Sequence, residues 1–312
     1  MFILRKLTAF LVVVVFAAAY LFYPAAAAVS HDLTDKVIIL DAGHGAENPN
    51  AYEDYEEQAT MLDLSYKLKP LLEAVGAKVL LVRPGEEDLP LPVRAATINK
   101  WALEAVRDAR LEDGGAASEI NEINRLIGVM QSVIDDPETN APIYFNIPFD
   151  YTYTREIHPD LRRIFELEDD PVIKDRFLVI SLHSNATGKP IKTEQNGVEV
   201  YYISNDLEKN ATYYSQYSNV ERSFYFANLL IDNISEVGLE KRYVKDYYYF
   251  MTREHNLPCV LAENGYHTNE HDRELLMNSA FRSRLAQVYV ETIQQYFDEI
   301  EYWLQPEAGV FG

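Results

Sequence analysis

The fold of this chain is decided by the stretch Val37-Ile38-Ile39-Leu40-Asp41-Ala42-Gly43-His44-Gly45. It opens on four consecutive apolar residues, which is typical of a strand buried on both faces of a sheet. It closes on a histidine between two glycines, and glycine lets the backbone turn sharply enough to aim an imidazole into a cleft. Because open α/β sheets carry their chemistry at the carboxyl ends of strands, His44 is a candidate functional residue, with a plain turn residue as the alternative.

The composition indicates a globular protein of acidic character. The 312 residues are 48% hydrophobic, which is enough for one large core or two modest ones. A formal net charge of −21 opposes binding to nucleic acid or to anionic membrane surfaces, because phosphates would be repelled. The single cysteine, Cys259, excludes an intrachain disulfide and a cluster of thiolate metal ligands.

The N-terminal segment has the order of an export signal. Arg5 and Lys6 precede an apolar run from Leu7 to Tyr23, and the small residues Ala25–Ala28 follow. We therefore expect residues 1–28 to be a signal peptide cleaved after Ala28. An uncleaved membrane anchor is the alternative, and only then would the protein contact a membrane. In both cases the body lies outside the cytoplasm, in the periplasm or the extracellular cell envelope.

Beyond the signal, strands and helices alternate as in a parallel α/β sheet. After the strand at 37–40, apolar residues recur at helical spacing from Leu64 to Val75, and a second strand is expected at 78–82. Further strands are expected at 177–181, 198–203, 246–251 and 258–261, and further helices at about 93–101, 221–237 and 281–296. The pattern predicts a doubly wound, mostly parallel, twisted sheet with helices on both faces, in a single domain spanning 29–312.

The α/β alternation is interrupted between about residues 101 and 174. The first half of this segment has helical spacing broken at Gly114 and Gly115, with a helix expected over 118–134. The second half is rich in proline, tyrosine and charged residues. Since strands are predicted on both sides, we interpret residues 101–174 as a largely helical insertion in the domain.

Three more polar clusters stand at or near the ends of predicted elements. The strand at 177–181 leads into His183, the strand at 258–261 leads into Glu263, and the acidic segment Glu53–Glu57 precedes the first helix. Two imidazoles and two carboxylates, with no usable thiol, fit a catalytic zinc site. One carboxylate would join the histidines as a ligand, a water would take the open position, and the other carboxylate would accept the proton of that water.

These segments resemble the four signature motifs of the zinc-dependent N-acetylmuramoyl-L-alanine amidases, amidase type 3. The matching residues are Asp41–Gly45, Glu57 to Leu62, Ser181–Asn185 and Leu261–Tyr266. The resemblance covers about 37–297 apart from the insertion. It implies a hydrolase of bacterial cell-wall peptidoglycan that cleaves the amide between the lactyl group of N-acetylmuramic acid and the L-alanine of the stem peptide.

The resemblance also implies roles for single residues. His44, Glu57 and His183 would bind one Zn²⁺, and Glu263 would be the general base. Glu56, the neighbour of Glu57 in the same charge run, is the alternative third ligand.

Substrate contacts are expected at Asn185 and Asn264, which lie in the third and fourth motifs, although Asn185 could also simply end its strand. Asp41 either orients His44 or caps a turn. His267, close behind the last motif, is expected to lie at the surface or cap a helix.

Two questions stay open at this point. The helix at 118–134, with Glu119 and Glu122, either covers the zinc cleft until an activator protein displaces it or belongs to a rigid wall of the substrate groove. The alternatives to the amidase function are a zinc peptidase or deacetylase acting on the cell wall, and a non-catalytic envelope scaffold of the same fold. A scaffold would ordinarily have lost a ligand or the base, and this chain has all four residues.

Overall fold

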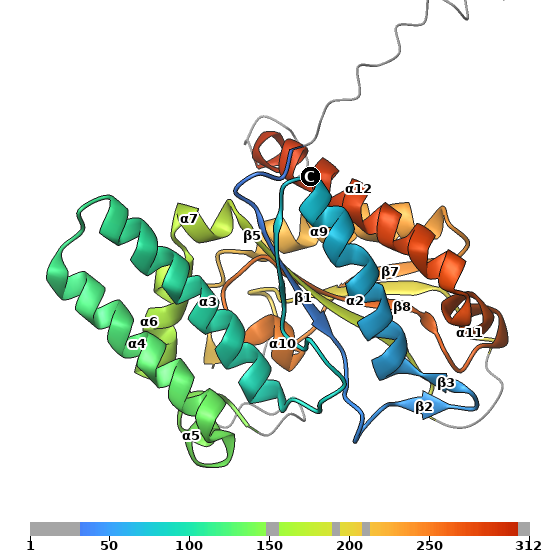
Figure 1. The fold of residues 1–312 in the computed structure, drawn as a ribbon, viewed down its shortest axis with the longest axis horizontal. Helices are drawn as coiled ribbons and strands as arrows, with labels where there is room; N and C mark the ends of the chain where they lie inside the picture. Colours follow the sequence, from blue (N-terminus) through green and yellow to red (C-terminus); the bar gives the residue numbers. More distant parts are fainter. Residues whose placement is uncertain (1–31, 148–155, 189–193, 208–212, 305–312) are drawn as a thin grey trace, which may run out of the picture. The chain divides into compact units, whose positions relative to one another are not determined.

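A six-stranded sheet forms the centre of the protein, in a computed structural model that describes residues 32–147, 156–188, 194–207 and 213–304 (Figure 1). The strand order is β4-β1-β5-β8-β6-β7. The strands β4 (Lys78–Leu81), β1 (Val37–Ala42), β5 (Phe177–Asn185) and β8 (Cys259–Tyr266) are mutually parallel. The strand β6 (Val198–Tyr202) runs antiparallel to β8, and β7 (Lys241–Asp246) runs parallel to β6. The predicted, mostly parallel sheet is therefore confirmed.

Helices cover both faces of the sheet. The helices α2 (Glu57–Ala74), α9 (Val220–Ser235) and α12 (Ser279–Trp303) pack on one face, in a core that includes Ile38 and Leu40 of β1. The helix α3 (Leu91–Glu112) packs on the other face, in a core that includes Ile39. Successive side chains of a strand point to opposite faces, so the continuous apolar run of β1 serves both cores. From Leu33 onward the described residues belong to one compact unit.

The segment 101–174 is helical, as expected. Its helices are the second half of α3, α4 (Ala117–Asp135), α5 (Pro137–Tyr144), α6 (Pro159–Glu168) and α7 (Pro171–Lys174). The sequence predicted α4 and the break before it but not the three short helices. Each of these begins with a proline at its first position, where the missing N–H costs nothing.

The prediction of a strand over Asp246–Met251 is wrong. The strand β7 ends at Asp246, and the chain then turns into the short helix α10 (Phe250–Arg253). The tyrosines at 247–249 have high strand propensity but lie in the connection between these elements. The real strand alternates half-buried and exposed residues, including two exposed lysines, so it lacks the apolar run by which the other strands were predicted.

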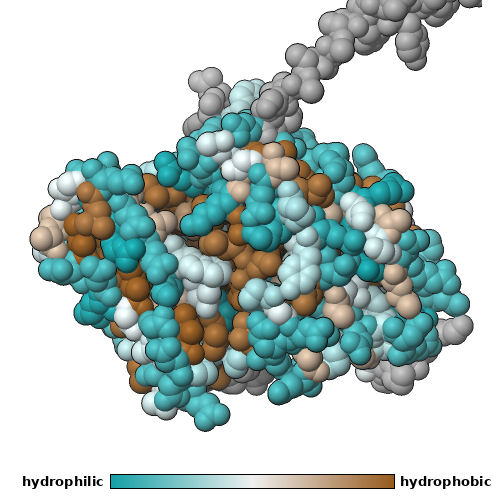
Figure 2. Space-filling view, viewed as in Figure 1, coloured by the Kyte–Doolittle hydropathy of each residue, from teal (hydrophilic) through white to brown (hydrophobic). Residues whose placement is uncertain are grey.

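A groove runs beside β4, which is an edge strand of the sheet. Apolar side chains gather between α3 and α2 over this edge, as Figure 2 shows. The groove has a volume of about 580 Å³, and Leu80 and Trp101 are among its lining residues. Within the part of the chain that the structure describes, the helices are too short or too polar for any of them to span a bilayer. The expected signal peptide, residues 1–28, lies outside the described residues.

Candidate metal centre and catalytic cleft

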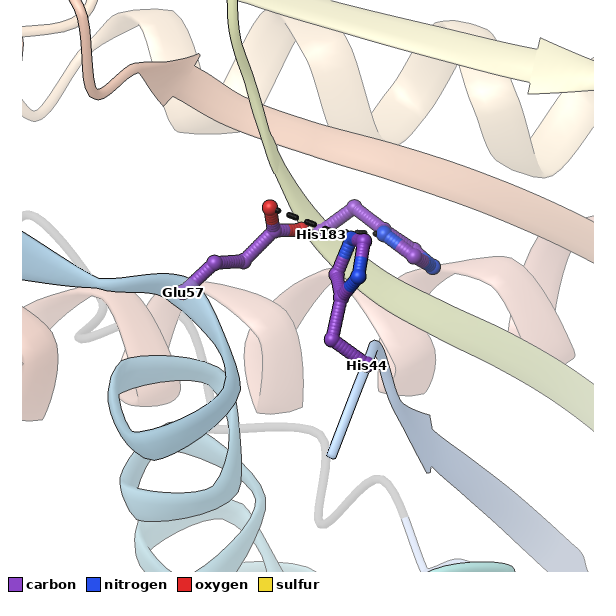
Figure 3. Close-up of side chains that lie close together, drawn as sticks. All are labelled: His44, Glu57 and His183. Carbon is purple, nitrogen blue, oxygen red and sulfur yellow. Dashed lines mark hydrogen bonds and ion pairs between the residues drawn. The ribbon is translucent and has the colours of Figure 1, made fainter. Parts of the chain in front are cut away.

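Three side chains from separate elements converge at the carboxyl edge of the parallel strands (Figure 3). His44 follows the end of β1, Glu57 is the first residue of α2, and His183 lies near the end of β5. Each offers one ligand atom, and these atoms all lie within 4.8 Å of one another. The two imidazole rings are 5.4 Å apart between centroids and nearly perpendicular, at 74°. The structure thus brings together the three residues that the sequence suggested as metal ligands.

Glu57 occupies the centre of this cluster and is fully buried. Its Oε1 lies 2.9 Å from His183 Nδ1 and accepts a hydrogen bond of 2.9 Å from the backbone N–H of Ser184. Its Oε2 lies 3.3 Å from His44 Nε2 and accepts a hydrogen bond of 2.5 Å from Asn50 Nδ2. A carboxylate is also favoured at the start of a helix by the helix dipole.

The local structure explains why Glu57 rather than Glu56 points inward. Glu56 ends the hairpin of β2 (Ala51–Tyr52) and β3 (Tyr55–Glu56), and its side chain is exposed. Successive residues of a strand point to opposite sides, so Tyr55 is buried. The change to helical geometry then brings Glu57 to the inner side.

Burial and mutual contact set the protonation of this cluster. Burial alone would raise the pKa of Glu57, but the hydrogen bonds and charges of His183 and His44 outweigh it and hold the pKa well below its ordinary value. Burial alone would lower the pKa of His183, but the contact with Glu57 outweighs it and raises the pKa. Glu57 therefore stays ionised beside the two imidazoles, and the three side chains together offer ligand atoms suited to a divalent cation.

The turn that carries His44 is held from inside by two buried arginines. His44 has a positive φ of 59°, which is uncommon for a residue with a side chain. Arg94 donates to the carbonyl oxygens of Ala42, at 2.8 Å, and of His44. Arg83 donates to the carbonyl oxygens of Ala42 and Gly43, both at 3.1 Å. These contacts fix the strained turn and with it the direction of the imidazole.

Asp41 helps to hold the same turn by binding Arg94. Its carboxylate accepts hydrogen bonds from Arg94 Nη1 at 2.9 Å and from the Ser181 hydroxyl at 2.8 Å. Burial alone would raise the pKa of Asp41, but Arg94, His183 and Ser181 together hold it below the ordinary value. The sequence left two roles open for Asp41, orienting His44 or capping a turn. These contacts fit the first role, because Arg94 links Asp41 to the turn that carries His44.

Glu263 faces the metal cluster across the sheet. It lies on β8 directly opposite His183 of β5, so both side chains point to the same face. Burial raises the pKa of Glu263 to about 8, with the negative charges of Glu57 and Glu199 acting in the same direction and His183 opposing them. Its Oε2 is buried and has no hydrogen-bond partner among the described residues. The Glu263 side chain also borders the cleft beside His44 and His183.

The cleft itself has a volume of about 450 Å³. His44, His183 and Glu263 line it together with apolar residues on two sides. The segment 89–91 forms one wall, and Phe250, Met251 and Leu261 contribute to the other. A cleft that combines apolar lining residues with a few convergent polar side chains is the usual form of a ligand-binding site.

The two asparagines expected to contact substrate do not line this cavity. Asn264 is fully buried; its amide donates to the carbonyl oxygens of His183 and Ala262 and accepts from the Tyr289 hydroxyl at 2.8 Å. All of its polar groups are used inside the fold, so we correct its expected role to the positioning of β8. Asn185 donates to Glu199 at 3.0 Å and accepts from the backbone N–H of Ala186, which fits the alternative of a strand end.

Sequence reasoning missed a support behind Glu57. His267 is buried rather than exposed, and its Nδ1 lies 3.0 Å from the Ser184 hydroxyl. The same hydroxyl lies 2.8 Å from the Tyr55 hydroxyl, and the Tyr55 ring stacks on His267 with centroids 5.0 Å apart. Ser184 in turn donates its backbone N–H to Glu57. The tyrosine within the acidic run of 53–57 was the one available signal, because tyrosine is buried more often than the acidic residues around it.

The insertion lies apart from the cleft. None of its described residues lines the cavity. Glu119 pairs with Arg110 at 3.0 Å and Glu122 with Arg163 at 3.2 Å, so both carboxylates have partners within the helical segment. The insertion is linked to the cleft through α3, whose first residues line the cavity, and through α10. The Phe145 ring packs on Phe250 at 5.8 Å.

The fold and the site together define a class. A mostly parallel α/β sheet that presents two histidines and a glutamate to a cleft, with a second glutamate opposite, has the donor set of the metal-dependent hydrolases. The chain belongs to the N-acetylmuramoyl-L-alanine amidase family, whose model matches residues 38–106 and 152–295. It is accordingly a peptidoglycan amidase, which cleaves the amide between N-acetylmuramic acid and L-alanine. The match leaves out 107–151, inside the expected insertion.

Solved amidase structures were found among the proteins similar to this chain, and one of them, at a TM-score of 0.51, shares its fold. The N-acetylmuramyl-L-alanine amidase Ami1 from Mycobacterium smegmatis is 14% identical, with a TM-score of 0.51, covering 86% of this chain and 99% of that one. The catalytic domain of CwlV from Bacillus (Paenibacillus) polymyxa is 19% identical, with a TM-score of 0.49, covering 84% and 98%. The CwlD amidase from Clostridioides difficile, solved in complex with the GerS lipoprotein, is 18% identical, with a TM-score of 0.49, covering 84% and 98%. No curated protein matches the sequence.

Proposed function

We propose that this amidase is zinc-dependent, with His44, Glu57 and His183 holding one Zn²⁺ and Glu263 acting as the general base. The observation that carries the proposal is the convergence of three ligand atoms within 4.8 Å at the base of the cleft, with Glu263 opposite. The donor set fits the metal, because two imidazole nitrogens and one carboxylate oxygen are common ligands of catalytic zinc. When bound, zinc supplies Lewis-acid activation of water and of the scissile carbonyl.

The protein's own contribution is the movement of one proton. Glu263 Oε2, buried and without a partner in the described chain, accepts a proton from the water that attacks the amide carbon. The same oxygen then returns the proton to the departing amine, so that the lactyl carboxylate and the free amino group of L-alanine are the products. Arg94 and Arg83 keep the His44 turn in place during this exchange.

The test is a comparison of variants with metal content and products measured together. Purified protein should contain one zinc per chain. Glu263→Ala should keep the zinc and lose turnover by about 10²- to 10⁴-fold, because it lacks the proton acceptor. His183→Ala should lose the zinc. Glu122→Gln, which alters a partnered carboxylate away from the cleft, is the matched control and should behave as the unaltered protein. Full activity in Glu263→Ala would reject the mechanism.

The same experiment identifies the bond that is cut. Mass analysis of the products from purified wall should show free lactyl carboxyl groups together with intact stem peptides. Shortened peptides or released acetate would contradict the proposed assignment of the cleft.

We further propose that the chain works in the periplasm or the extracellular envelope, and that residues 1–28 are the signal that exports it. The support is the order of basic, apolar and small residues in that segment, together with a wall substrate that lies outside the cytoplasm. N-terminal sequencing of the protein recovered from the envelope tests the cut after Ala28. An intact N-terminus in the membrane fraction would favour the anchor.

For the insertion we propose the role of a fixed support rather than an inhibitory cover. It packs behind α10, whose residues line the cleft, and Arg253 of α10 donates to the Asn146 carbonyl at 2.7 Å. The carboxylates of Glu119 and Glu122 are held by arginines of the helical segment. The double variant Glu119→Gln with Glu122→Gln should therefore hydrolyse wall at an unchanged rate. A marked gain would instead support a cover that an activator protein displaces.

A further inference from the structure

The sheet face that carries His183 and Glu263 continues beyond the cleft onto β6 and β7. Glu199 of β6 lies directly opposite Glu263, and Tyr201 lies opposite Leu261, which lines the cleft. Tyr243 of β7 lies beside Glu199 in turn. Because neighbouring residues in paired strands point to the same face, these side chains extend the row that begins at the metal centre.

Five tyrosines gather on this extension, which we call the tyrosine platform: Tyr201, Tyr243, Tyr247, Tyr248 and Tyr249. Tyr201 is buried at its centre, with the rings of Tyr249 at 5.1 Å, Tyr247 at 6.0 Å and Tyr243 at 6.1 Å packed edge-on against it. Tyr247 and Tyr248 stack at 4.8 Å with their planes 14° apart. Tyr243 is 40% exposed, and Tyr247 to Tyr249 are half-buried.

The platform is held rigidly from below by Glu199. This buried carboxylate accepts hydrogen bonds from the Tyr201 hydroxyl at 2.7 Å, the Tyr266 hydroxyl at 2.5 Å and Arg242 Nε at 2.5 Å. The Asn185 amide donates to it at 3.0 Å. This network fixes the Tyr201 ring, against which Tyr243, Tyr247 and Tyr249 pack, so the centre of the platform is preformed for a ligand.

The platform meets the catalytic cleft at Tyr249. Tyr249 lines the same cavity as His183 and Glu263, and its ring touches Tyr201. Cations lie over two of the rings: Lys245 Nζ is 5.7 Å from the centre of Tyr247, and the Arg242 guanidinium is 5.6 Å from that of Tyr243. A ligand that lies here therefore meets the exposed side of Tyr243 and the half-buried Tyr248, with cationic hydrogen-bond donors next to them.

That combination matches the chemistry of a sugar ring. A pyranose has an apolar C–H face that packs flat on an aromatic ring, and hydroxyl and acetamido groups at its edge that take hydrogen bonds. We propose that the tyrosine platform is a glycan subsite that binds the N-acetylated sugar rings next to the muramoyl residue whose amide lies in the cleft. The inference rests on the proposed function of that cleft and deepens it, because it makes the polymer rather than the isolated muramoyl peptide the preferred substrate.

Binding of a sugar that carries no scissile amide tests the platform independently of catalysis. The probe is chitotetraose, the tetramer of N-acetylglucosamine, titrated by calorimetry or NMR into zinc-loaded and metal-stripped protein. Tyr243→Ala and Tyr248→Ala should each weaken binding by about tenfold, the value of one aromatic contact. Tyr243→Phe keeps the ring and should restore most of the affinity. Tyr302→Ala, on an exposed ring of α12, is the matched control.

A kinetic measurement gives a second readout. The unaltered enzyme should have a lower KM for glycan strands of several sugars than for a single muramoyl peptide. Tyr243→Ala should remove that advantage, and thermal unfolding of each variant shows that it is folded. If Tyr243→Ala does not fold, Tyr248→Ala carries the test.

Several results would overturn the proposal. These are absence of chitotetraose binding to the folded, unaltered protein, equal binding by Tyr243→Ala, and displacement of the sugar by free stem peptide. Failure of the proposed function looks different. A protein that does not cleave the amide, yet binds chitotetraose in a manner dependent on Tyr243, would retain the glycan subsite and lose the amidase mechanism.

Discussion

Gly43 sets the space in which the His183 imidazole lies. A Cβ atom at this position would stand 2.4 Å from His183 Cε1, which no packing allows. We therefore expect Gly43→Ala to displace the imidazole and lower zinc content and turnover by at least tenfold, with the secondary structure retained. Zinc analysis and circular dichroism measure the two effects. Gly128→Ala is the control, because a Cβ there meets open space in α4; an equal loss of zinc in both variants would contradict the steric account.

Glu168 predicts a dependence of stability on pH that is separate from the metal centre. Burial raises its pKa well above the ordinary value of 4.5, although the backbone N–H of Asn256 donates to it. The folded protein therefore keeps this proton at pH values where the unfolded chain has released it. The contribution of Glu168 to the free energy of unfolding is therefore greatest below about pH 4.5, and it is lost as the pH rises toward the raised pKa.

The variant Glu168→Gln tests this dependence because a glutamine does not ionise. Its free energy of unfolding relative to the unaltered protein, measured in urea at pH 4.5 and pH 8, should shift in favour of the variant at the higher pH. Glu166→Gln, half-exposed on the same helix, is the control. A difference that does not change with pH would contradict the prediction.

The sequence predicted those site residues whose positions follow from the pattern of strands. It did not predict those whose positions depend on packing between distant parts of the chain. His44, His183 and Glu263 each follow an apolar run, so the predicted strands place them at one edge of the sheet. Glu57 rather than Glu56 depends on how a hairpin joins a helix, which the spacing alone does not fix. The inner position of Asn264 depends on Tyr289 of α12, 25 residues later.

At the scale of elements, Asp272 ties the start of α11 (Glu270–Met277) to two strands. Its Oδ2 accepts hydrogen bonds from the backbone N–H of Gly197 at 2.6 Å, just before β6, and of Tyr266 at 2.8 Å, at the end of β8. Asp272→Ala should leave both donors buried without a partner and cost about 2 to 5 kcal/mol of unfolding free energy.

Urea denaturation measures this cost. Glu274→Ala is the control. It removes an exposed carboxylate from the same helix and leaves both hydrogen bonds of Asp272 in place, so it separates the loss of those bonds from the loss of a charge. A cost below about 0.5 kcal/mol for Asp272→Ala would show that water replaces the carboxylate.

The predicted elements succeeded where one local signal dominated. The buried strands and the long helices have apolar patterns of their own. The helices α5, α6 and α7 begin at Pro137, Pro159 and Pro171, and a proline reads as a break as readily as a helix start. The tyrosines at 247–249 favour a strand by propensity, but they lie in the connection after β7, where Tyr247 and Tyr249 pack on Tyr201.

At the scale of the whole molecule, metal binding should couple to stability. A ligand that binds only the folded state stabilises it by mass action, by about 2.7 kcal/mol at a free concentration of 100 times Kd. Zinc should therefore raise the melting temperature of the metal-stripped protein, and His183→Ala should abolish the rise. His271→Ala, an exposed histidine of α11, is the control. A rise that persists in His183→Ala would place the zinc elsewhere.

The four residues of the proposed site lie far apart along the chain, at positions 44, 57, 183 and 263. His183 reaches the cluster only after β5 has paired with β1, and Glu263 only after β8 has paired with β5. A chain that emerges from its N-terminus therefore carries no complete site until more than four fifths of its length has appeared and docked. The proposed site is therefore assembled only when β8, the last of the four mutually parallel strands along the chain, has paired with β5.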